Sequence, residues 1–460
     1  MTTPREELLP GTRRALLHRV AVAQAEARVP SVVAAVARDG RMVWSGARGS
    51  VDGQEPDAGT QYRIGSITKT FTAVLVLRLR DEGLIGLSDP LEKHLPGTGV
   101  GEVTVAQLLD HSAGLAAESP APWWERTPGE LRPGLADVLG ERPVVHPAGR
   151  RHHYSNPGFT LLGSLVEAVR GVPWAEALRR EVLEPLSMDR TTPQPVAPAA
   201  GGWAVHPWAD VMLPERVESL GLMAPAGQLW STAADLCRFA GFLAEGDEKV
   251  LSAASVAELR TPSVAPETGQ WDGGYGLGTQ LMRHGDRTLV GHTGSLPGFV
   301  AGLWASVADG VAAVVLANAT SGLASGSVAA ELIGIVADAE PRIPAPWKPL
   351  PEVDQELLAL TGPWYWGTQA VGLKLTADGG LELRPLRGGG RGSSFVPAGD
   401  GGWTGLDGYY AGETLRVVRR PDGSVSHLDL GSFVFTRGPY EPGDAVPGGV
   451  DSGGWRGLDG

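Results

Sequence analysis

A run of prolines near residue 350 divides this sequence into two parts with different patterns. The segment PRIPAPWKPLPEVD, residues 341–354, holds five prolines between positions 341 and 351. Proline lacks a backbone N–H and fixes φ, so this run supports neither helix nor sheet and is typical of a stiff linker. It predicts a large folding unit over residues 1–340 and a small one over 355–440. The Gly/Pro/Asp-rich tail, 441–460, is expected to be disordered.

The larger unit carries strand patterns at both ends and helix patterns between them. Residues 31–48 form two strand-like runs joined by Asp39-Gly40, a dipeptide typical of tight hairpins. Strand-like runs return near the end of the unit, where apolar residues alternate or run on as in buried sheets. This order predicts an α/β sandwich in which both ends contribute to one antiparallel sheet. The predicted helices cover residues 66–82, 104–110, 158–170, 174–183, 232–244 and 252–259, and the later strands cover 287–292, 299–307 and 311–318.

The smaller unit has the pattern of a compact all-β domain. Residues 358–437 contain short β-like runs separated by glycines and Asp-Gly turns. Strands of this length with turns between them predict a small barrel or sandwich, and the barrel is preferred. Arg437, at the end of the last run, is expected to close that strand. The alternative is that Arg437 reaches a substrate cleft and holds a carboxylate.

Composition excludes several classes of function. The net charge of −13, without any block rich in lysine or arginine, argues against a nucleic-acid partner. The one cysteine, Cys237, lies in an apolar helix pattern and is expected to be a packed thiol, so no disulfide within the chain is possible. Residues 1–30 lack the apolar block of a signal peptide and predict an amphipathic helix, and no apolar run is long enough to span a membrane. The expected location is cytoplasmic.

The stretch RIGSITKTFTA places Ser66 three residues before Lys69 at the start of a predicted helix. Residues three apart share one helix face, so the lysine amine can reach the serine hydroxyl. A lysine withdrawn from water loses its proton more easily and can accept the serine proton, which makes the pair a nucleophile and its base. Alone, the tetrad is a weak signal that is more typical of a helix cap, because serine is a preferred residue at helix starts.

Two further stretches supply polar groups of the kinds that acyl transfer needs. In HHYSNPGF, Tyr154 precedes Asn156; a tyrosine near cationic groups can act as a base, and an asparagine amide can bind a substrate amide. In LVGHTGSLPGF, a strand leads into His292, Thr293, Gly294 and Ser295, where the Ser295 N–H can join that of Ser66 in holding an oxyanion. Separately, the first stretch also fits a simple turn and the second a strand with a glycine bulge.

In this order, the three stretches resemble the serine β-lactamase and penicillin-binding-protein superfamily, in its class C-like branch of esterases, D-aminopeptidases and cell-wall-type peptidases. LLDHSAGL (108–115) and APAGQLWSTAADLCRFA (224–240) resemble flanking segments of that family. The resemblance implies a β-lactamase-like sandwich with an all-helical lobe over residues 10–335. The trailing β-rich part resembles the lipocalin-like domain that follows this domain in some members.

The resemblance also implies roles for individual residues. Ser66 would form the acyl-enzyme, with Lys69 holding or taking its proton. Tyr154 would relay a proton to the leaving group and then activate the second nucleophile, and Asn156 would orient the acyl group. Thr293, Gly294 and Ser295 would contact substrate along the strand. His292 stands where the family's Lys-Thr-Gly lysine is found; a neutral histidine there would bond Tyr154 or the leaving group but would hold a carboxylate weakly.

These features predict a serine hydrolase that acts on a small ester or peptide-like amide and releases the acyl group to water, without a metal or organic cofactor. One alternative is a penicillin-binding-protein-type thioesterase that receives a peptidyl thioester from a carrier protein and cyclises it. Another is a non-catalytic protein that binds β-lactams or peptides.

The spacing of His111, His152 and His153 does not favour a metal site. Four tryptophans in loop-like segments either line a substrate cleft or fill the core: Trp123, Trp124, Trp203 and Trp208. Oligomeric state stays open.

Overall fold

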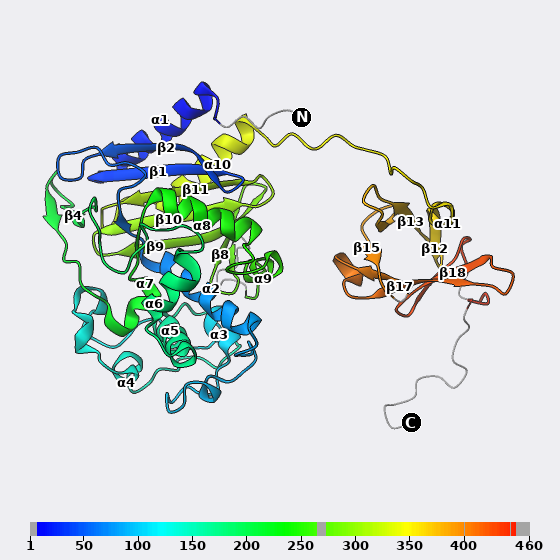
Figure 1. Ribbon diagram of the computed structural model, residues 1–460, viewed down its shortest axis with the longest axis horizontal. Coiled ribbons are helices and arrows are strands. Elements are labelled where there is room, and N and C mark those ends of the chain that lie inside the picture. The colour runs from blue at the N-terminus through cyan, green and yellow to red at the C-terminus, as the bar shows by residue number, and fades with distance from the viewer. Residues whose placement is uncertain (1–6, 265–272, 400, 442, 448–460) are drawn as a thin grey trace. The chain divides into compact units, whose positions relative to one another are not determined.

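The computed structural model describes residues 7–264, 273–399, 401–441 and 443–447. The chain divides into two compact units, residues 1–343 and 344–460 (Figure 1). Most of the predicted tail, 441–460, lies outside the described residues. Within the part of the chain that is described, no helix is both long enough and apolar enough to cross a membrane.

The larger unit is built around a seven-stranded antiparallel sheet that joins its two ends. The strand order is β2-β1-β11-β10-β9-β8-β7, so the N-terminal hairpin continues the sheet formed by the later strands. Asp39 and Gly40 have φ values of 48° and 73°, as a tight hairpin turn requires. Both the hairpin and the shared sheet confirm the predicted sandwich. The strands are β1 (Ser31–Arg38), β2 (Arg41–Gly49), β7 (Gly273–Tyr275), β8 (Gln280–His284), β9 (Arg287–Leu296), β10 (Phe299–Ser306) and β11 (Val311–Ala317).

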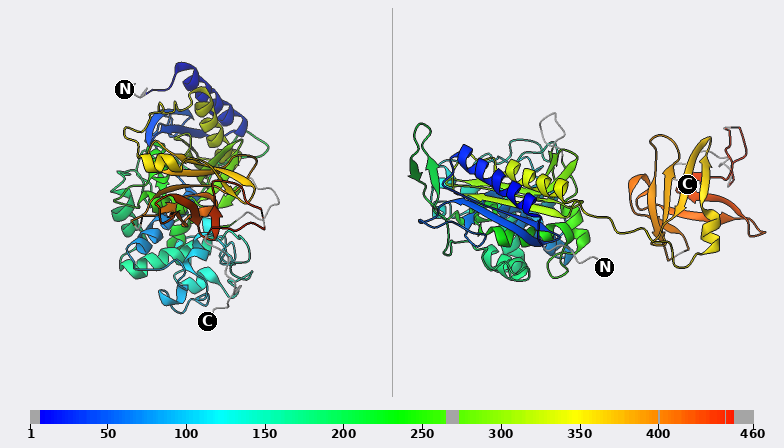
Figure 2. Two further views of the ribbon diagram at one scale, coloured as in Figure 1. Left: turned by 90° about the vertical axis from the view of Figure 1, so that its right-hand side faces the viewer. Right: turned by 90° about the horizontal axis from the view of Figure 1, so that it is seen from above.

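Helices cover both faces of this sheet, as the turned views show (Figure 2). On one face, α1 (Pro10–Ala27) and α10 (Ser325–Ala339) pack against each other and the strands. On the other face lies α8 (Ala233–Glu245). All residues of β10 and β11 are therefore buried. The sequence did not predict α10, because Ala324 at its start offers no side-chain cap.

Below the sheet, a group of helices includes α2 (Thr68–Asp81), which directly follows the 3₁₀ turn Gly65–Ile67. Eleven of the fourteen residues of α2 are buried, so this helix is enclosed by protein on nearly all sides. Phe71 stacks on Phe239 of α8 with the ring centres 3.8 Å apart. Of the other helices in this group, α5 (Asn156–Arg170), α6 (Trp174–Leu178) and α7 (Ala224–Gly227) pack against α2. The remaining ones are α3 (Val105–Leu109), α4 (Leu135–Leu139) and α9 (Ala253–Leu259).

Two short strand pairs complete the larger unit. β3 (Tyr62–Arg63) pairs with β6 (Trp230–Ser231), and this pair holds the chain directly before the 3₁₀ turn. β4 (Trp203–Val205) pairs with β5 (Met212–Pro214).

The smaller unit is an antiparallel sheet of eight strands that curls into a nearly closed barrel, as the sequence predicted. Each strand pairs with the next along the chain, and a bridge between Tyr365 and Thr436 brings the first and last strands together. The interior is filled by apolar side chains such as Trp364 and Phe395. The elements are α11 (Gln355–Leu360), β12 (Gly362–Trp366), β13 (Gln369–Leu375), β14 (Leu381–Pro385), β15 (Ser393–Pro397), β16 (Trp403–Gly405), β17 (Thr414–Arg419), β18 (Val425–Leu430) and β19 (Phe433–Phe435).

Arg437 follows β19 and closes this barrel. Its guanidinium lies 3.9 Å from the centre of the Trp364 ring and donates to the carbonyl oxygens of Thr361 and Pro363 at 3.0 and 3.2 Å. This placement matches the expected closing role. The likeness to lipocalin-like domains stays a prediction.

Candidate active site

The turn that carries Ser66 is fixed by its surroundings on both sides. The Ile64 N–H donates to the Leu229 carbonyl at 2.9 Å, which ties the chain just before the turn to the segment ahead of β6. Gly65 has a φ of 51°, a conformation that side chains other than glycine rarely adopt. Ser66 follows directly and is half-buried, whereas its neighbours on both sides are fully buried. The hydroxyl is therefore held in one place and reaches a cleft.

Lys69 lies one turn further along and is completely buried. Its Nζ is 3.1 Å from Ser66 Oγ, 2.6 Å from Asn156 Oδ1 and 2.8 Å from the Ala226 carbonyl oxygen. Burial lowers the pKa of Lys69 to about 7, although the nearby carboxylates of Glu118 and Glu125 oppose this change. A neutral amine has two hydrogens and one lone pair. The two fixed acceptors take the hydrogens, so the lone pair is left for the Ser66 hydroxyl.

Tyr154 lies on the other side of the same hydroxyl. Lys69 Nζ is 4.8 Å from the centre of the Tyr154 ring. Burial raises the pKa of Tyr154, and its hydrogen bond with the Ser66 side chain only partly offsets this change. The expectation that Tyr154 would ionise more easily near a cation is therefore wrong, because withdrawal from water dominates. Burial thus favours the neutral form of both side chains, the amine of Lys69 and the phenol of Tyr154.

Asn156, the first residue of α5, links Lys69 to a carboxylate that the sequence analysis missed. Its Nδ2 donates to both carboxylate oxygens of Glu118 at 3.0 Å, while its Oδ1 accepts from Lys69. Glu118 also accepts from the Trp124 indole N–H at 2.6 Å. Both ends of the Asn156 amide are thus occupied, so its predicted contact with substrate stays a prediction. The loop position of Glu118 gave no pattern that could have identified it.

β9 brings the His292–Ser295 stretch against the nucleophile turn. A Cβ atom added at Gly294 would lie 2.0 Å from the Ile64 carbonyl oxygen and 3.0 Å from the Ser66 nitrogen. A Cβ atom at Gly65 would lie 2.8 Å from the Ser295 nitrogen. The turn and β9 can approach this closely because residues 65 and 294 are both glycines. The approach brings the backbone nitrogens of Ser66 and Ser295 near each other. An oxyanion hole needs two such N–H groups beside one cleft, and this role of Ser66 and Ser295 stays a prediction.

His292 is buried and neither of its ring nitrogens bonds Tyr154, whereas the alternative bond to a leaving group stays a prediction. Its Nε2 lies 3.0 Å from the hydroxyl of Tyr275, and its Nδ1 lies 2.5 Å from the Thr293 carbonyl oxygen. Burial lowers the pKa of His292 to about 3, so the ring is neutral at pH 7. The sequence analysis also missed Tyr275, although its place between glycines in GGYGLG is unusual for a large side chain.

These groups open onto a cleft of about 580 Å³. Of the predicted residues, Ser66, Tyr154 and the whole His292–Ser295 stretch line it. Thr293 is held in place by Gln280, whose side-chain oxygen accepts from the Thr293 N–H at 2.9 Å. The four tryptophans considered as cleft residues do not line it, and Trp304 does. Trp124 is buried, whereas Trp123 and Trp208 are exposed.

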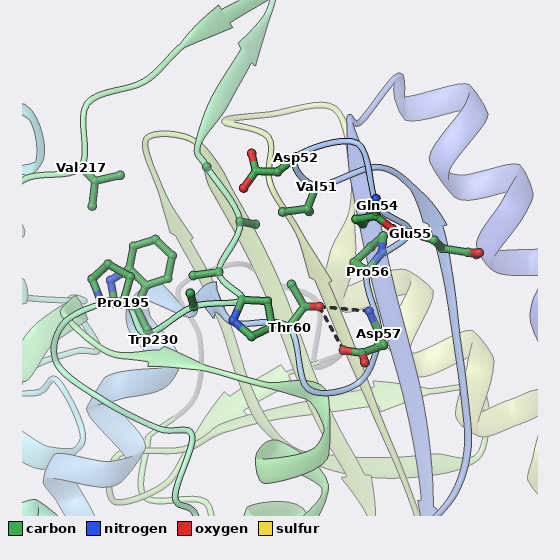
Figure 3. A pocket seen from close by; sticks show the side chains of 15 residues that line it. Val51, Asp52, Gln54, Glu55, Pro56, Asp57, Thr60, Pro195, Val217 and Trp230 are labelled. Atoms are coloured by element: carbon green, nitrogen blue, oxygen red, sulfur yellow. Dashed lines mark hydrogen bonds between the residues drawn. The ribbon is translucent and has the colours of Figure 1, made fainter.

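A second pocket, of about 680 Å³, lies between the loop 51–60 and the segment 195–201 (Figure 3). Its acidic side chains are Asp52, Glu55 and Asp57, of which Asp57 accepts from the Thr60 hydroxyl at 3.0 Å. No serine lines this pocket. The nucleophile and its base therefore belong to the smaller cleft.

The histidines considered as metal ligands have other contacts. Both ring nitrogens of His111 are hydrogen-bonded, to the Ser155 N–H at 3.0 Å and the Tyr275 hydroxyl at 3.2 Å. Among the described residues, no three histidine, cysteine or carboxylate side chains form a group that could hold a metal ion. Cys237 is buried in α8, and burial raises the pKa of its thiol to about 12.

The sequence of this chain matches known protein families. Residues 17–338 match the family model described as Beta-lactamase, and residues 353–437 match a domain of unknown function, DUF7586. "Penicillin-binding protein 4" of Amycolatopsis lactamdurans is 28% identical over 64% of this chain and 82% of that protein. "Beta-lactamase-like protein 2" of Dictyostelium discoideum is 27% identical over 51% of this chain, but the match spans only 46% of that longer protein.

Solved structures share the same fold. The octameric penicillin-binding protein homologue from Pyrococcus abyssi has a TM-score of 0.63 at 24% identity, over 92% of this chain and 99% of that one. A D-stereospecific amidohydrolase from Streptomyces sp. has a TM-score of 0.59 at 27% identity, over 70% and 98%. A protein named SurE, which was also solved with D-Leu, has a TM-score of 0.58 at 26% identity, over 93% and 99%.

The family match covers more than half of the chain and includes every predicted site residue. The chain belongs to the β-lactamase family of serine hydrolases.

Proposed function

We propose that this chain is an acyl hydrolase that forms an acyl-enzyme on Ser66 from a peptide-like amide or ester and releases the acyl group to water. The observation that carries the proposal is the position of Lys69, whose Nζ lies 3.1 Å from Ser66 Oγ while two acceptors fix its hydrogens. A buried amine held in this way is a general base for the serine.

Each of these residues is proposed to carry out one part of the acyl transfer. Neutral Lys69 takes the proton as Ser66 Oγ bonds to the carbonyl carbon, and the Ser66 and Ser295 N–H groups stabilise the oxyanion. The bond to the leaving group then breaks, and Tyr154 donates a proton to that group, regaining one from Lys69. Deacylation runs in reverse with water as the nucleophile, and returns the proton to Ser66 Oγ.

The acyl group is proposed to have the D-configuration. The likeness to the Streptomyces D-stereospecific amidohydrolase and to SurE, solved with D-Leu, supports this choice. Those likenesses also favour an amide over a β-lactam. The neutral ring of His292 supports a substrate without a carboxylate beside the bond that breaks.

A second candidate differs only in the final acceptor. An amine of the same peptide would attack the acyl-enzyme in place of water, and the peptide would arrive as a thioester on a carrier protein. The volume of the cleft, about 580 Å³, supports this candidate because it leaves room for a folded-back peptide. A non-catalytic binding role has no comparable support, since all the proton-transfer groups are in place.

The test compares D- and L-phenylalanine p-nitroanilide, with a p-nitrophenyl acyl ester as a reactive control. Intact mass and released chromophore are followed for the wild-type protein and for Ser66→Ala. We expect turnover of the D-anilide and an acyl adduct only when Ser66 is present. Equal activity in Ser66→Ala would refute the nucleophile, and preference for the L-anilide would refute the stereochemistry. A mixture of added amine and water then shows which acceptor the acyl-enzyme uses.

A further inference from the structure

A chain of hydrogen bonds runs behind the cleft from His111 through Tyr275 to His292, and none of the proposed catalytic steps uses it. The three side chains come from distant parts of the sequence: the loop after α3, strand β7 and strand β9. Their exposed fractions are 1%, 3% and 1% respectively. Water therefore does not compete for these bonds, and each ring nitrogen and the hydroxyl must find protein partners.

The backbone groups at the two ends of this hydrogen-bond network fix the direction of every hydrogen bond in it. The Ser155 backbone N–H can only donate, so His111 Nδ1 is the acceptor at 3.0 Å. The Thr293 carbonyl can only accept, so His292 Nδ1 carries a hydrogen. Burial lowers the pKa of both histidines, which keeps both rings neutral.

These assignments also fix the direction of the two hydrogen bonds that Tyr275 makes. Neutral His111, with an unprotonated Nδ1, has a hydrogen on Nε2 and donates it to the Tyr275 hydroxyl at 3.2 Å. Neutral His292, with a hydrogen on Nδ1, has a lone pair on Nε2 and accepts from the same hydroxyl at 3.0 Å. Tyr275 uses its hydroxyl once as acceptor and once as donor.

No catalytic side chain replaces Tyr275 as the partner of His292. The Tyr154 ring centre is 6.2 Å from that of His292, and no hydrogen bond joins the two residues. The tight position of Tyr275 is shaped by its neighbours: a Cβ atom at Gly276 would lie 2.3 Å from the Leu259 carbonyl oxygen. The backbone next to Tyr275 is thus packed closely against the Leu259 carbonyl.

We propose that Tyr275 is a positioning residue that holds His292 in one neutral form and so keeps the β9 wall of the cleft uncharged. Leaving groups without a carboxylate are then preferred over those that carry one. This preference rests on the proposed function, whereas the assignment of the hydrogen bond does not. The other titratable groups around the network are Lys69, Asp110, His152, His153 and Tyr154.

The first test is nitrogen NMR of protein labelled in its histidines, which needs no substrate. In the wild type, we expect His292 to show a protonated Nδ1 and a hydrogen-bonded, unprotonated Nε2 that does not titrate from pH 5 to 9. Tyr275→Phe should change the Nε2 signal, while the control Tyr154→Phe should leave it in place. An unchanged signal in Tyr275→Phe, or a change only in Tyr154→Phe, would overturn the assignment.

The second test compares kcat/KM for D-phenylalanine p-nitroanilide with that for its analogue carrying a carboxylate on the anilide ring. The wild type should prefer the neutral anilide by roughly tenfold, and His292→Lys should remove this preference. Tyr275→Phe removes the hydrogen-bond donor to His292 Nε2 and with it the fixed position of the ring, so its preference for the neutral anilide should weaken. Equal loss on both substrates would make Tyr275 merely structural and refute the proposal. Hydrolysis of neither substrate would refute the proposed function instead, and the NMR result would still stand.

Discussion

The charge on Glu118 is predicted to set the pH at which the Ser66–Lys69 pair becomes active. The Glu118 carboxylate is linked to Lys69 through the Asn156 amide, and its negative charge favours the ammonium form of the lysine. Activity requires the neutral amine. The value of kcat/KM should therefore rise with pH through about 7 in the wild type. Glu118→Gln keeps an acceptor for Asn156 but removes the charge, so the same rise should occur at lower pH.

The size of this shift follows from the separation of the two charges. One amide group lies between them, on the order of 7 Å, which at an effective dielectric constant of about 20 corresponds to about 2 kcal/mol. Glu118 is exposed, however, and water screens its charge. The expected displacement is therefore smaller, about half to one pH unit.

The assay is the pH dependence of kcat/KM for a p-nitrophenyl acyl ester between pH 5 and 9. Glu118→Asp is the matched control, because it retains the charge, and its profile should stay close to that of the wild type. Thermal unfolding of each variant checks that the fold is intact. A profile that does not move in Glu118→Gln, or that moves toward higher pH, would refute the electrostatic reasoning.

Three further changes test other parts of the structure. Gly294→Ala forces a Cβ atom against the Ile64 carbonyl, so β9 or the nucleophile turn must shift: kcat should fall by about a hundredfold and the unfolding temperature should also fall; an unchanged kcat would remove Gly294 from the oxyanion hole. The pKa of Lys69 is about 7 in the folded protein against 10.5 in the unfolded chain, so the folded state is favoured as the pH rises from 7 to 9. Over this range, the unfolding free energy of the wild type, measured by urea titration, should rise by roughly 2 kcal/mol relative to that of Lys69→Met. A constant difference between the two proteins would contradict that pKa. Arg437→Ala should destabilise the smaller unit by about 1 kcal/mol without changing acyl-enzyme formation; loss of acylation would restore its alternative role as a carboxylate ligand.

The features that the sequence predicted depend on local signals. The Asp39-Gly40 hairpin follows from the backbone freedom of two adjacent residues, and α2 follows from its apolar periodicity. The predicted proximity of Ser66 and Lys69 needs only helix geometry, and the distance of 3.1 Å agrees with it. Such local patterns can be recognised in the sequence without knowing the rest of the fold.

The features that the sequence did not predict arise from contacts between distant segments. Tyr275 meets His111 across 164 positions, and Glu118 meets Asn156 across 38. Neither pairing leaves a periodic pattern in the chain. The direction of the Tyr154 pKa also depends on burial, which is a property of the assembled fold and not of the residues next to it.

The state of Cys237 makes this chain well suited to site-specific labelling. The chain has no other cysteine, and maleimide reagents attack exposed thiolates, whereas this thiol is buried and protonated at pH 7. New cysteines can therefore replace exposed residues without first removing the natural one. One such residue on each compact unit, for example at exposed Trp208 and exposed Leu406, would accept a fluorophore pair. Energy transfer between the two dyes would then report how the proline-rich segment spaces the units while substrate turns over.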